Sequence, residues 1–352
     1  MYLTGLGTAV PHGRFTQTEC WEALQRAPQF SRLKERSRAL LAKVLSGENG
    51  IVSRHLAVAT LEEIFVLTPD TLHTRFARHA PVLATEAAEH ALAAARIEAP
   101  QVDAIIISTC TGYLCPGLTS YVSESLGLRE DVMALDLVGQ GCGAALPNWR
   151  AAEALLKADG ARHVLSVCVE VCSAAFYLDD DPGVLISACL FGDGAGAAVL
   201  SVEPAAHARR AEWRASGTLL RPEDRDALRF EQRGGMLRNI LTRQVPALAA
   251  KHVGSLLADM LERNSLTRAD VTGWILHPGG REVLTALGSR LGLNETDLRH
   301  SAGVLRDYGN VSSPAVIFAL ERALAENAPG GWWWLSSFGA GFSCHGAFLK
   351  VD

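Results

Sequence analysis

The sequence predicts an α/β fold made of two related halves, because two strand-like segments recur with similar surroundings. Val102–Ser108 is a nearly continuous apolar run, which is typical of a strand buried on both faces. Thr272–His277 is a similar run, and both follow a short segment that contains Val and an acidic residue. The first run leads to Cys110 and the second ends at His277, so a residue with a reactive or polar side chain stands at the end of each run.

The spacing beyond these two residues supports the same conclusion. Cys110 and Cys142 are 32 residues apart, and His277 and Asn310 are 33 residues apart. In both halves the second residue belongs to a Gly-containing turn that opens a predicted helix. Repeated offsets of this kind indicate an internal duplication.

A further apolar strand follows each of these helices. The strands cover 163–169 and 332–336, and in each half the strand is reached 23 residues after the second polar residue. We therefore divide the chain into an N-terminal half, 1–202, and a C-terminal half, 203–352.

The first hundred residues are expected to contain one strand and three helices. Thr16 and Glu19 have the spacing of a capping box, which predicts that a helix begins there. The next helix carries several Arg and Lys residues, which form either a solvated face or a contact with an anionic substrate. The predicted elements are a strand over 2–10 and helices over 16–27, 30–45 and 74–95.

Cys142 lies in a glycine-rich turn between a predicted strand, Val132–Leu137, and a helix that is expected from Pro147. Glycines on both sides allow a sharp turn and leave room for a substrate. A helix N-terminus stabilises negative charge and lowers the pKa of a nearby thiol. Cys142 is therefore placed like a nucleophile, although free cysteines are also common as small buried apolar residues.

Asn310 occupies the corresponding place in the second half. We expect Ser313 to cap the following helix and Pro314 to take its first position. Cys142, His277 and Asn310 all follow predicted strands, and ligands of α/β sheets bind outside the carboxyl ends of strands. If a pseudo-twofold axis relates the halves, the three side chains converge.

Composition excludes several classes of function. The chain has 352 residues, 48% of them hydrophobic and 20% charged, so a large core is available. A net charge of −5 argues against nucleic acid or an anionic membrane as a partner. Met1–Pro11 lacks a signal-peptide pattern, and Gly183–Leu200 is interrupted by Asp193 and glycines, so no membrane span is expected. A cytoplasmic protein follows.

The eight cysteines do not indicate a disulfide framework in a cytosolic chain of this size. Cys168 and Cys172 have a spacing that could supply two zinc ligands, but no second Cys/His pair matches it. Because they lie in or next to a predicted strand, core positions are the alternative, and no metal site is expected.

A cysteine beside a histidine suits formation of a thioester, since the thiolate attacks an acyl carbonyl. The amide of Asn310, with His277, could hold the oxyanion that develops when a malonyl thioester loses CO₂. A Cys/His/Asn set also occurs in papain-like peptidases, but the duplicated α/β order does not fit them.

Five motifs together resemble the type III polyketide synthases, the chalcone-synthase-like enzymes. The resemblance implies a five-layer αβαβα thiolase fold, a homodimer, and Cys142, His277 and Asn310 as catalytic triad. It implies acyl-CoA and malonyl-CoA as substrates, decarboxylative Claisen condensation, cyclisation, and no cofactor. The motifs are Gly141–Gly143, Leu190–Ala195, His277–Gly280, Tyr308–Ser313 and Phe338–Gly341.

The resemblance also assigns residues that bind substrate. Phe191 matches a phenylalanine between the CoA tunnel and the cavity, although core packing would also explain it. Asn239 stands where the family has a second gating phenylalanine, and Phe230 could fill that space. Arg54 is expected near the CoA phosphates, or is only a surface charge. Gly279 and Ser312 belong to the motifs around His277 and Asn310.

Other positions depart from the pattern of the plant enzymes. Cys110, Cys172 and Ala175 replace residues that line the cavity, and the small Ala175 favours a fatty acyl starter. Cys115 falls where the family often projects a residue into the partner's cavity. Asp193 is expected to stabilise a turn rather than to act in catalysis.

The leading hypothesis is a polyketide synthase that makes an alkylresorcinol, an alkylpyrone or a related phenolic. A ketoacyl synthase III-like enzyme that performs one condensation on acyl carrier protein is the alternative. A catalytically silent thiolase-fold scaffold is a third possibility. The sequence leaves the starter, its carrier, the number of extensions and the cyclisation mode open.

Overall fold

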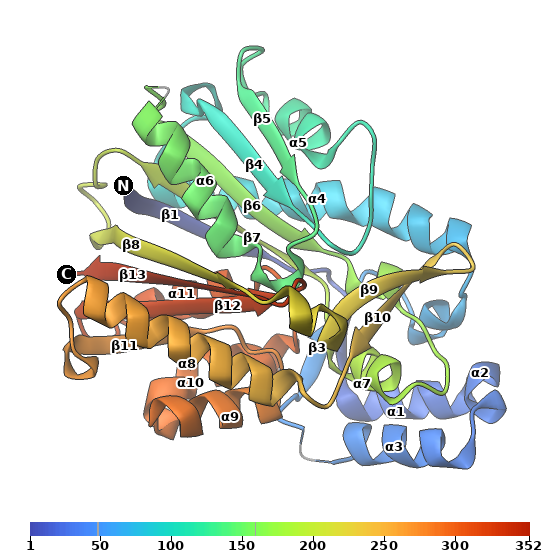
Figure 1. The fold of residues 1–352 in the computed structure, drawn as a ribbon. Coiled ribbons are helices and arrows are strands. Elements are labelled where there is room, and N and C mark those ends of the chain that lie inside the picture. Colours follow the sequence, from blue (N-terminus) through green and yellow to red (C-terminus); the bar gives the residue numbers. More distant parts are fainter. Residues whose placement is uncertain (48, 159) are drawn as a thin grey trace.

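The main β-sheet takes strands from both halves of the sequence (Figure 1). The computed structural model describes residues 1–47, 49–158 and 160–352, and within them this sheet has nine strands in the order β11-β12-β13-β8-β1-β7-β6-β4-β5. The N-terminal half supplies β1 (Tyr2–Ala9), β4 (Ala104–Ser108), β5 (Met133–Leu137), β6 (His163–Glu170) and β7 (Gly194–Ser201). The C-terminal half supplies β8 (Ala211–Leu220), β11 (Val271–Leu276), β12 (Gly331–Gly339) and β13 (Ser343–Val351).

The two halves repeat the same strand pairing. β4 and β6 are parallel neighbours in the first half, as β11 and β12 are in the second. β6 then pairs antiparallel with β7, and β12 pairs antiparallel with β13. The halves meet where β1 contacts β8, through a register pair between Tyr2 and Glu212. The boundary predicted between residues 202 and 203 lies in the connection from β7 to β8.

Helices form three layers around the two parts of the sheet. α6 (Ala145–Ala158) and α11 (Ala315–Ala325) contact strands of both halves, so they lie between them. α4 (Pro69–Ala95) packs on β1, β6 and β7, and α8 (Val245–Arg263) packs on β8, β12 and β13. The order of layers is therefore αβαβα, as the resemblance implies.

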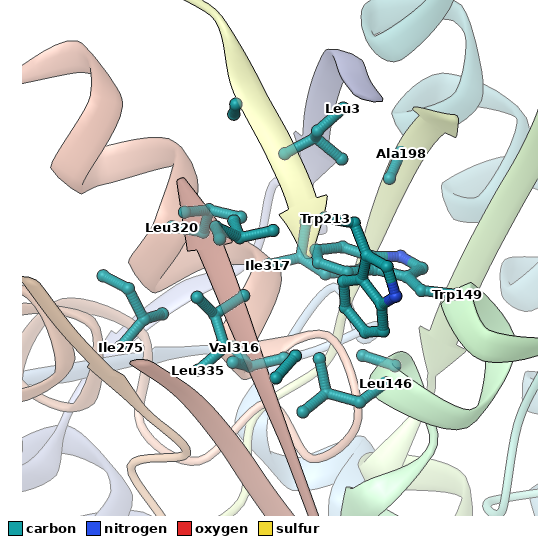
Figure 2. Close-up of a cluster of buried hydrophobic side chains, with 14 of the residues drawn as sticks. Leu3, Leu146, Trp149, Ala198, Trp213, Ile275, Val316, Ile317, Leu320 and Leu335 are labelled. Carbon is teal, nitrogen blue, oxygen red and sulfur yellow. The ribbon is translucent and has the colours of Figure 1, made fainter. Parts of the chain in front are cut away.

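A large apolar cluster holds the central helical layer between the halves. Trp149 of α6 and Trp213 of β8 meet edge to face, with ring centroids 6.0 Å apart. Burying each Val, Leu or Ile of this cluster stabilises the fold by about 1.5–3 kcal/mol relative to exposure. The packing fixes α6, which follows Cys142, against α11, which follows Asn310. Figure 2 shows Leu146, Trp149, Val316, Ile317, Leu320 and Leu335 within the cluster.

A group of helices lies beside the β9–β10 hairpin, away from the two chain ends (Figure 1). Arg238 of β10 pairs with Asp179 at 2.7 Å, Glu231 at 2.6 Å and Asp181 at 3.2 Å. These ion pairs fix the hairpin to the segment that leads into α7. The elements are α1 (Gln17–Arg26), α2 (Pro28–Arg32), α3 (Glu35–Leu45), α7 (Pro182–Leu190), β9 (Leu228–Arg233) and β10 (Met236–Leu241).

Several predicted helix ends are confirmed and others are wrong. The capping box of Thr16 and Glu19 begins α1, as predicted. The helix expected over 30–45 is two helices, because residues 33 and 34 are extended. The helix expected from 74 begins at Pro69, where the Thr68 side chain caps it. The remaining elements are β2 (Arg14–Thr16), β3 (Ser53–His55), α5 (Leu118–Leu126), α9 (Arg281–Leu291) and α10 (Glu295–Tyr308).

The strand expected before Asn310 is absent from the described residues, and this is a correction. Where the first half has β5, the second has α10, which ends at Tyr308. Asn310 keeps only an isolated parallel bridge, to Phe191. Ser313 does not cap α11 either, because Pro314 is the N-cap residue and the Ser313 hydroxyl donates to Glu170. In the described part of the chain, no helix is long and apolar enough to cross a membrane.

Candidate active site

Cys142 lies in a short 3₁₀ turn, η3 (Gly141–Gly143), between β5 and α6. The end of β12 presses against this turn from the other half of the chain. The hydroxyl of Ser337 donates to the Gly143 carbonyl at 2.9 Å. A Cβ at Gly339 would lie 2.2 Å from the Gln140 carbonyl oxygen, so only glycine allows this approach. Both halves therefore position the nucleophile.

The thiol of Cys142 is buried, and its Sγ lies 3.2 Å from the Oγ of Ser312. Burial raises the pKa of Cys142 to about 12, and the hydrogen bond with Ser312 opposes this shift. The resting residue is thus a thiol at neutral pH, and it becomes nucleophilic only when a base takes its proton.

His277 directly follows β11 and is 1% exposed. Burial lowers the pKa of His277 to about 3, so the imidazole is neutral. Its Nδ1 has no hydrogen-bond partner among the described residues, and its ring meets Phe338 edge to face. Burial therefore favours a neutral thiol and a neutral imidazole over a thiolate–imidazolium pair.

The amide of Asn310 is held from both ends. Its Nδ2 donates to the Gly279 carbonyl at 3.1 Å, and its Oδ1 accepts from the Ser312 N–H at 2.9 Å. One N–H of the amide stays available, because a primary amide carries two. A fixed donor of this kind suits a developing oxyanion.

An outer cavity of about 690 Å³ brings Cys142, His277 and Asn310 together. Gly279 and Phe338 complete its wall near the three residues. Farther along, its lining includes the basic side chains of Lys43, Arg243 and Arg281. The cavity therefore joins a reactive centre to cationic groups.

A narrower inner cavity of about 70 Å³ continues beyond Cys142. Cys142, Phe191 and Leu228 line both cavities, so they mark the junction. The inner wall is largely apolar and draws on α1, α3, α7 and the hairpin. Its apolar members include Leu24, Leu41, Leu45, Ile64, Phe65, Val184 and Phe230.

The predicted substrate-binding residues fall into three groups. Phe191 lies at the junction and Gly279 lines the outer cavity. Cys110 lines neither cavity, since its Sγ lies against Glu170 at 3.2 Å, and this corrects its assignment as a cavity residue. The residues that line the inner cavity are Cys172, Ala175, Asn239, Ser312 and Arg54.

Arg54 does not have the surface position expected for a contact with CoA phosphates. It is 5% exposed, and its Nη1 donates to the carbonyls of Ala188 and Phe191 at 2.9 and 3.0 Å. The guanidinium is therefore held by backbone next to the junction. Lys43, Arg243 and Arg281 line the outer cavity instead. Lys43 belongs to the basic segment 30–45, for which a contact with an anionic substrate was one of two alternatives, whereas Arg243 and Arg281 gave no signal in the sequence.

Glu170 is a site residue that the sequence reasoning missed. It is fully buried at the end of β6, and burial raises the pKa of its carboxyl. The only feature of the sequence that could have indicated it is an acidic residue at the end of an otherwise largely apolar strand. It accepts hydrogen bonds from the side chains of Ser313 at 2.6 Å, Thr111 at 2.9 Å and Cys110 at 3.2 Å. Glu170 thus supports the shell behind Cys142 and Ser312.

Asp193 joins separate segments of the chain, whereas we expected it to stabilise its own turn. Its carboxylate accepts from the Ala57 N–H at 2.6 Å and from both the N–H and hydroxyl of Ser173. Cys168 is fully buried in β6, while Cys172 lines the inner cavity. Within the described residues, no group of three or more His, Cys, Asp or Glu side chains could hold a metal ion.

Two family models of known proteins together match nearly the whole chain. A family model described as "FAE1/Type III polyketide synthase-like protein" matches residues 11–225. The model "Chalcone and stilbene synthases, C-terminal domain" matches residues 215–350.

Curated relatives also match this chain over most of its length. A 3,5-dihydroxyphenylacetyl-CoA synthase of Streptomyces toyocaensis is 28% identical over 99% of this chain and 89% of that protein. A 1,3,6,8-tetrahydroxynaphthalene synthase of Streptomyces peucetius subsp. caesius is 30% identical over 97% and 91%. The α-pyrone synthesis polyketide synthase-like Pks18 of Mycobacterium tuberculosis is 26% identical over 92% and 84%.

Solved structures agree with the layered fold. PKS-I from the brown alga Ectocarpus siliculosus superposes with a TM-score of 0.91 and 26% identity, covering 99% of this chain and 98% of that one. The tetrahydroxynaphthalene synthase of Streptomyces coelicolor A3(2) gives a TM-score of 0.88 at 24% identity, over 100% and 99% of the two chains.

Proposed function

The chain belongs to the type III polyketide synthases, and from this premise we propose that it extends an unbranched fatty acyl-CoA starter with malonyl-CoA. The observation that carries the proposal is the narrow apolar cavity that continues from Cys142 and Phe191 away from the basic outer lining. The enzyme class is acyltransferase.

Loading of the starter uses Cys142 and His277. As the thiol attacks the acyl carbonyl, its proton passes to the neutral imidazole, and CoA leaves as the thiolate, which takes the proton back. Neutral partners suit this step, because a preformed ion pair would be costly at a site with this degree of burial.

Extension uses His277 and Asn310 on malonyl-CoA. Loss of CO₂ leaves an enolate whose oxygen accepts hydrogen bonds from the free Asn310 N–H and from His277 in its N–H tautomer. The enolate carbon attacks the acyl thioester on Cys142, forms the new carbon–carbon bond and releases the sulfur. No group has to remove a proton from carbon, since decarboxylation generates the nucleophile.

The inner cavity sets the size of the starter. Its volume of about 70 Å³ is small, so we expect a straight chain of short or medium length, such as octanoyl, to fit better than a long one. Each methylene of the starter that is buried against the apolar lining stabilises the bound state by about 0.8 kcal/mol. The extended chain then cyclises to an alkylresorcinol, an alkylpyrone or a related phenolic, as the pyrone-forming relative illustrates.

The basic residues of the outer lining suit the phosphates of CoA. Lys43, Arg243 and Arg281 line the same cavity as the triad, so a thioester that enters from this side would place its carbonyl at Cys142. We expect no cofactor other than these CoA substrates, and activity should persist in EDTA.

A set of acyl-CoAs incubated with labelled malonyl-CoA tests the proposal. Mass spectrometry should show products extended more than once, with the highest kcat/KM near octanoyl-CoA, and no product from Cys142→Ala. A single extension that requires acyl carrier protein would favour the ketoacyl synthase alternative. A wild-type protein that neither forms an acyl-enzyme at Cys142 nor extends the starter would indicate a silent scaffold.

We also propose a homodimer in a reducing compartment such as the cytoplasm. β5 is an edge strand of the main sheet, and exposed apolar side chains gather on or near it: Met133, Val138, Tyr113 and Tyr121. Cys115 is exposed in the same region of the chain and would face the second copy. All eight cysteines are free, which suits a reducing environment.

A further inference from the structure

One face of the β9–β10 hairpin forms a wall of the inner cavity. Phe230 of β9 is in register with Asn239 of β10, and both line the cavity. Cross-strand partners lie on the same face of a hairpin, so their side chains point to the same side. Asn239 is therefore a polar residue on an otherwise largely apolar wall.

The Oδ1 of Asn239 lacks a hydrogen-bond partner among the described residues. The residue is 7% exposed, and its Oδ1 is buried without a hydrogen bond to any described residue. The neighbouring Arg238 holds β10 through its ion pairs with Asp179 and Glu231. Because a buried amide is costly to leave unsatisfied and this strand is fixed, the site favours a ligand that pairs with the amide.

The register places Asn239 a short way beyond the reactive centre. Leu228 lines both cavities and marks the junction, whereas Phe230, two residues along β9, lines the inner one alone. Two residues of a strand span roughly 6.6 Å. Asn239, the register partner of Phe230, therefore lies about that distance farther into the inner cavity than the junction at Leu228. The first few carbons of a chain carried on Cys142 reach this region.

We propose that Asn239 binds the 3-oxo oxygen of a β-ketoacyl intermediate carried on Cys142, so the enzyme distinguishes a partly extended chain from a saturated starter. This inference rests on the proposed function. The enol form of the 3-oxo group donates its O–H to the unpaired Oδ1, while the keto form accepts from Nδ2. A saturated acyl chain offers only methylenes there and leaves the amide unsatisfied.

Asn239→Leu tests the assignment, because leucine has a similar volume and no hydrogen-bonding group. The measured quantity is kcat/KM for 3-oxooctanoyl-CoA relative to octanoyl-CoA, each with malonyl-CoA. This ratio should fall about tenfold in the variant, which corresponds to about 1.4 kcal/mol. Because both primers are measured in the same variant, a general change in the cavity wall cancels in this ratio.

Phe230→Leu is the matched control, since it alters the same wall without changing its hydrogen bonding. It should shift both primers together and leave the ratio unchanged. An unchanged ratio in Asn239→Leu would overturn the assignment, as would an equal fall in Phe230→Leu.

Binding in the Cys142→Ala background separates this inference from the proposed function. Calorimetry there should show tighter binding of 3-oxooctanoyl-CoA than of octanoyl-CoA, and Asn239→Leu should remove the difference. If the wild type extends neither primer, the proposed function fails, while this binding difference still decides the role of Asn239. Equal dissociation constants before the substitution would refute it.

Discussion

The Sγ of Cys142 lies 3.2 Å from the Oγ of Ser312, and this contact joins the nucleophile of one half to the Asn310 loop of the other. Ser312 has a φ of 59°, in the left-handed region that side chains rarely adopt. Such a conformation costs about 1–3 kcal/mol and persists only where its surroundings hold it. Here the Ser312 N–H donates to Asn310 Oδ1, so one strained residue positions both the thiol and the amide.

Alkylation of Cys142 should depend steeply on pH. Because its pKa is about 12 and the thiolate is the reactive form, the rate with iodoacetamide should rise about tenfold per pH unit from about pH 7 to 9. Ser312→Ala should slow alkylation further, since it removes the contact that lowers this pKa. Peptide mass spectrometry gives the rates, with free cysteine alkylated under the same conditions as the reference. A plateau near neutral pH would instead indicate an ion pair with His277.

Decarboxylation of malonyl-CoA should require the two oxyanion donors. His277→Ala and Asn310→Ala should each lower CO₂ release from labelled malonyl-CoA by about 10²–10³-fold. Asn310→Asp keeps an acceptor for the Ser312 N–H but loses both amide N–H donors, the one that binds the Gly279 carbonyl and the one that remains available. Decarboxylation at the wild-type rate in these variants would refute the assignment.

That Cys142, His277 and Asn310 meet at one cavity could be predicted from the sequence, because each of them lies close to a local signal. Glycines mark the turn of Cys142, an apolar strand precedes His277, and Pro314 marks the helix after Asn310. The spacing of the two halves then brings them to one place. The strand predicted before Asn310 was wrong because the segment carries a local helix signal, the capping box of Asn294 and Asp297 that begins α10. The bridge to Phe191 keeps Asn310 in position.

The surroundings of the triad could not be predicted, because they depend on distant segments that meet. Glu170, Cys110 and Ser312 belong to three separate segments of the chain and contact one another only in the folded protein. Arg54 was misassigned for the same reason: a surface arginine and a buried one have the same sequence. Its backbone acceptors belong to α7 and to the residue that follows it, more than a hundred residues away.

Gly339→Ala should abolish condensation while the protein stays folded. The new Cβ would meet the Gln140 carbonyl at 2.2 Å and the Gly143 nitrogen at 2.6 Å, so the turn that carries Cys142 must move. A displacement of this size typically costs about 10²-fold in rate. Ala340→Gly, one residue along the same loop, is the control and should keep most activity. Circular dichroism checks the fold, and full activity of Gly339→Ala would contradict the packing argument.

Charged residues on the β5 edge should dissociate the proposed dimer. Met133 is 43% exposed and Val138 is 63% exposed, so Met133→Asp with Val138→Asp adds charge without disturbing the core of one copy. Sedimentation velocity should show a dimer for the wild type and a monomer for the double variant. Val82→Asp, on the exposed face of α4, should leave the dimer intact. A monomeric wild type would refute the proposed interface.

Acid should destabilise the fold through its buried histidines. His345 is suited to test this effect, because it is buried but is not one of the three residues assigned to catalysis. Burial lowers the pKa of His345 to about 4, from an ordinary value of 6.5. Between these two pH values the unfolded chain binds more protons than the native one, so the free energy of unfolding rises with pH. For one histidine the slope reaches up to about 1.4 kcal/mol per pH unit.

His345→Gln should therefore flatten the pH dependence of stability between about pH 6.5 and 4, without changing it above that window. The side chain lies beside the nucleophile turn, and glutamine can keep a hydrogen bond to Thr218, which the Nδ1 of His345 makes at 3.1 Å. Urea unfolding of both proteins at several pH values gives the difference between their free energies of unfolding. The contributions of the other buried groups are the same in both proteins and cancel in this difference. His73→Gln, an exposed position on α4, should follow the wild type. Parallel curves for His345→Gln and the wild type would show that His345 titrates alike in both states, contrary to its burial.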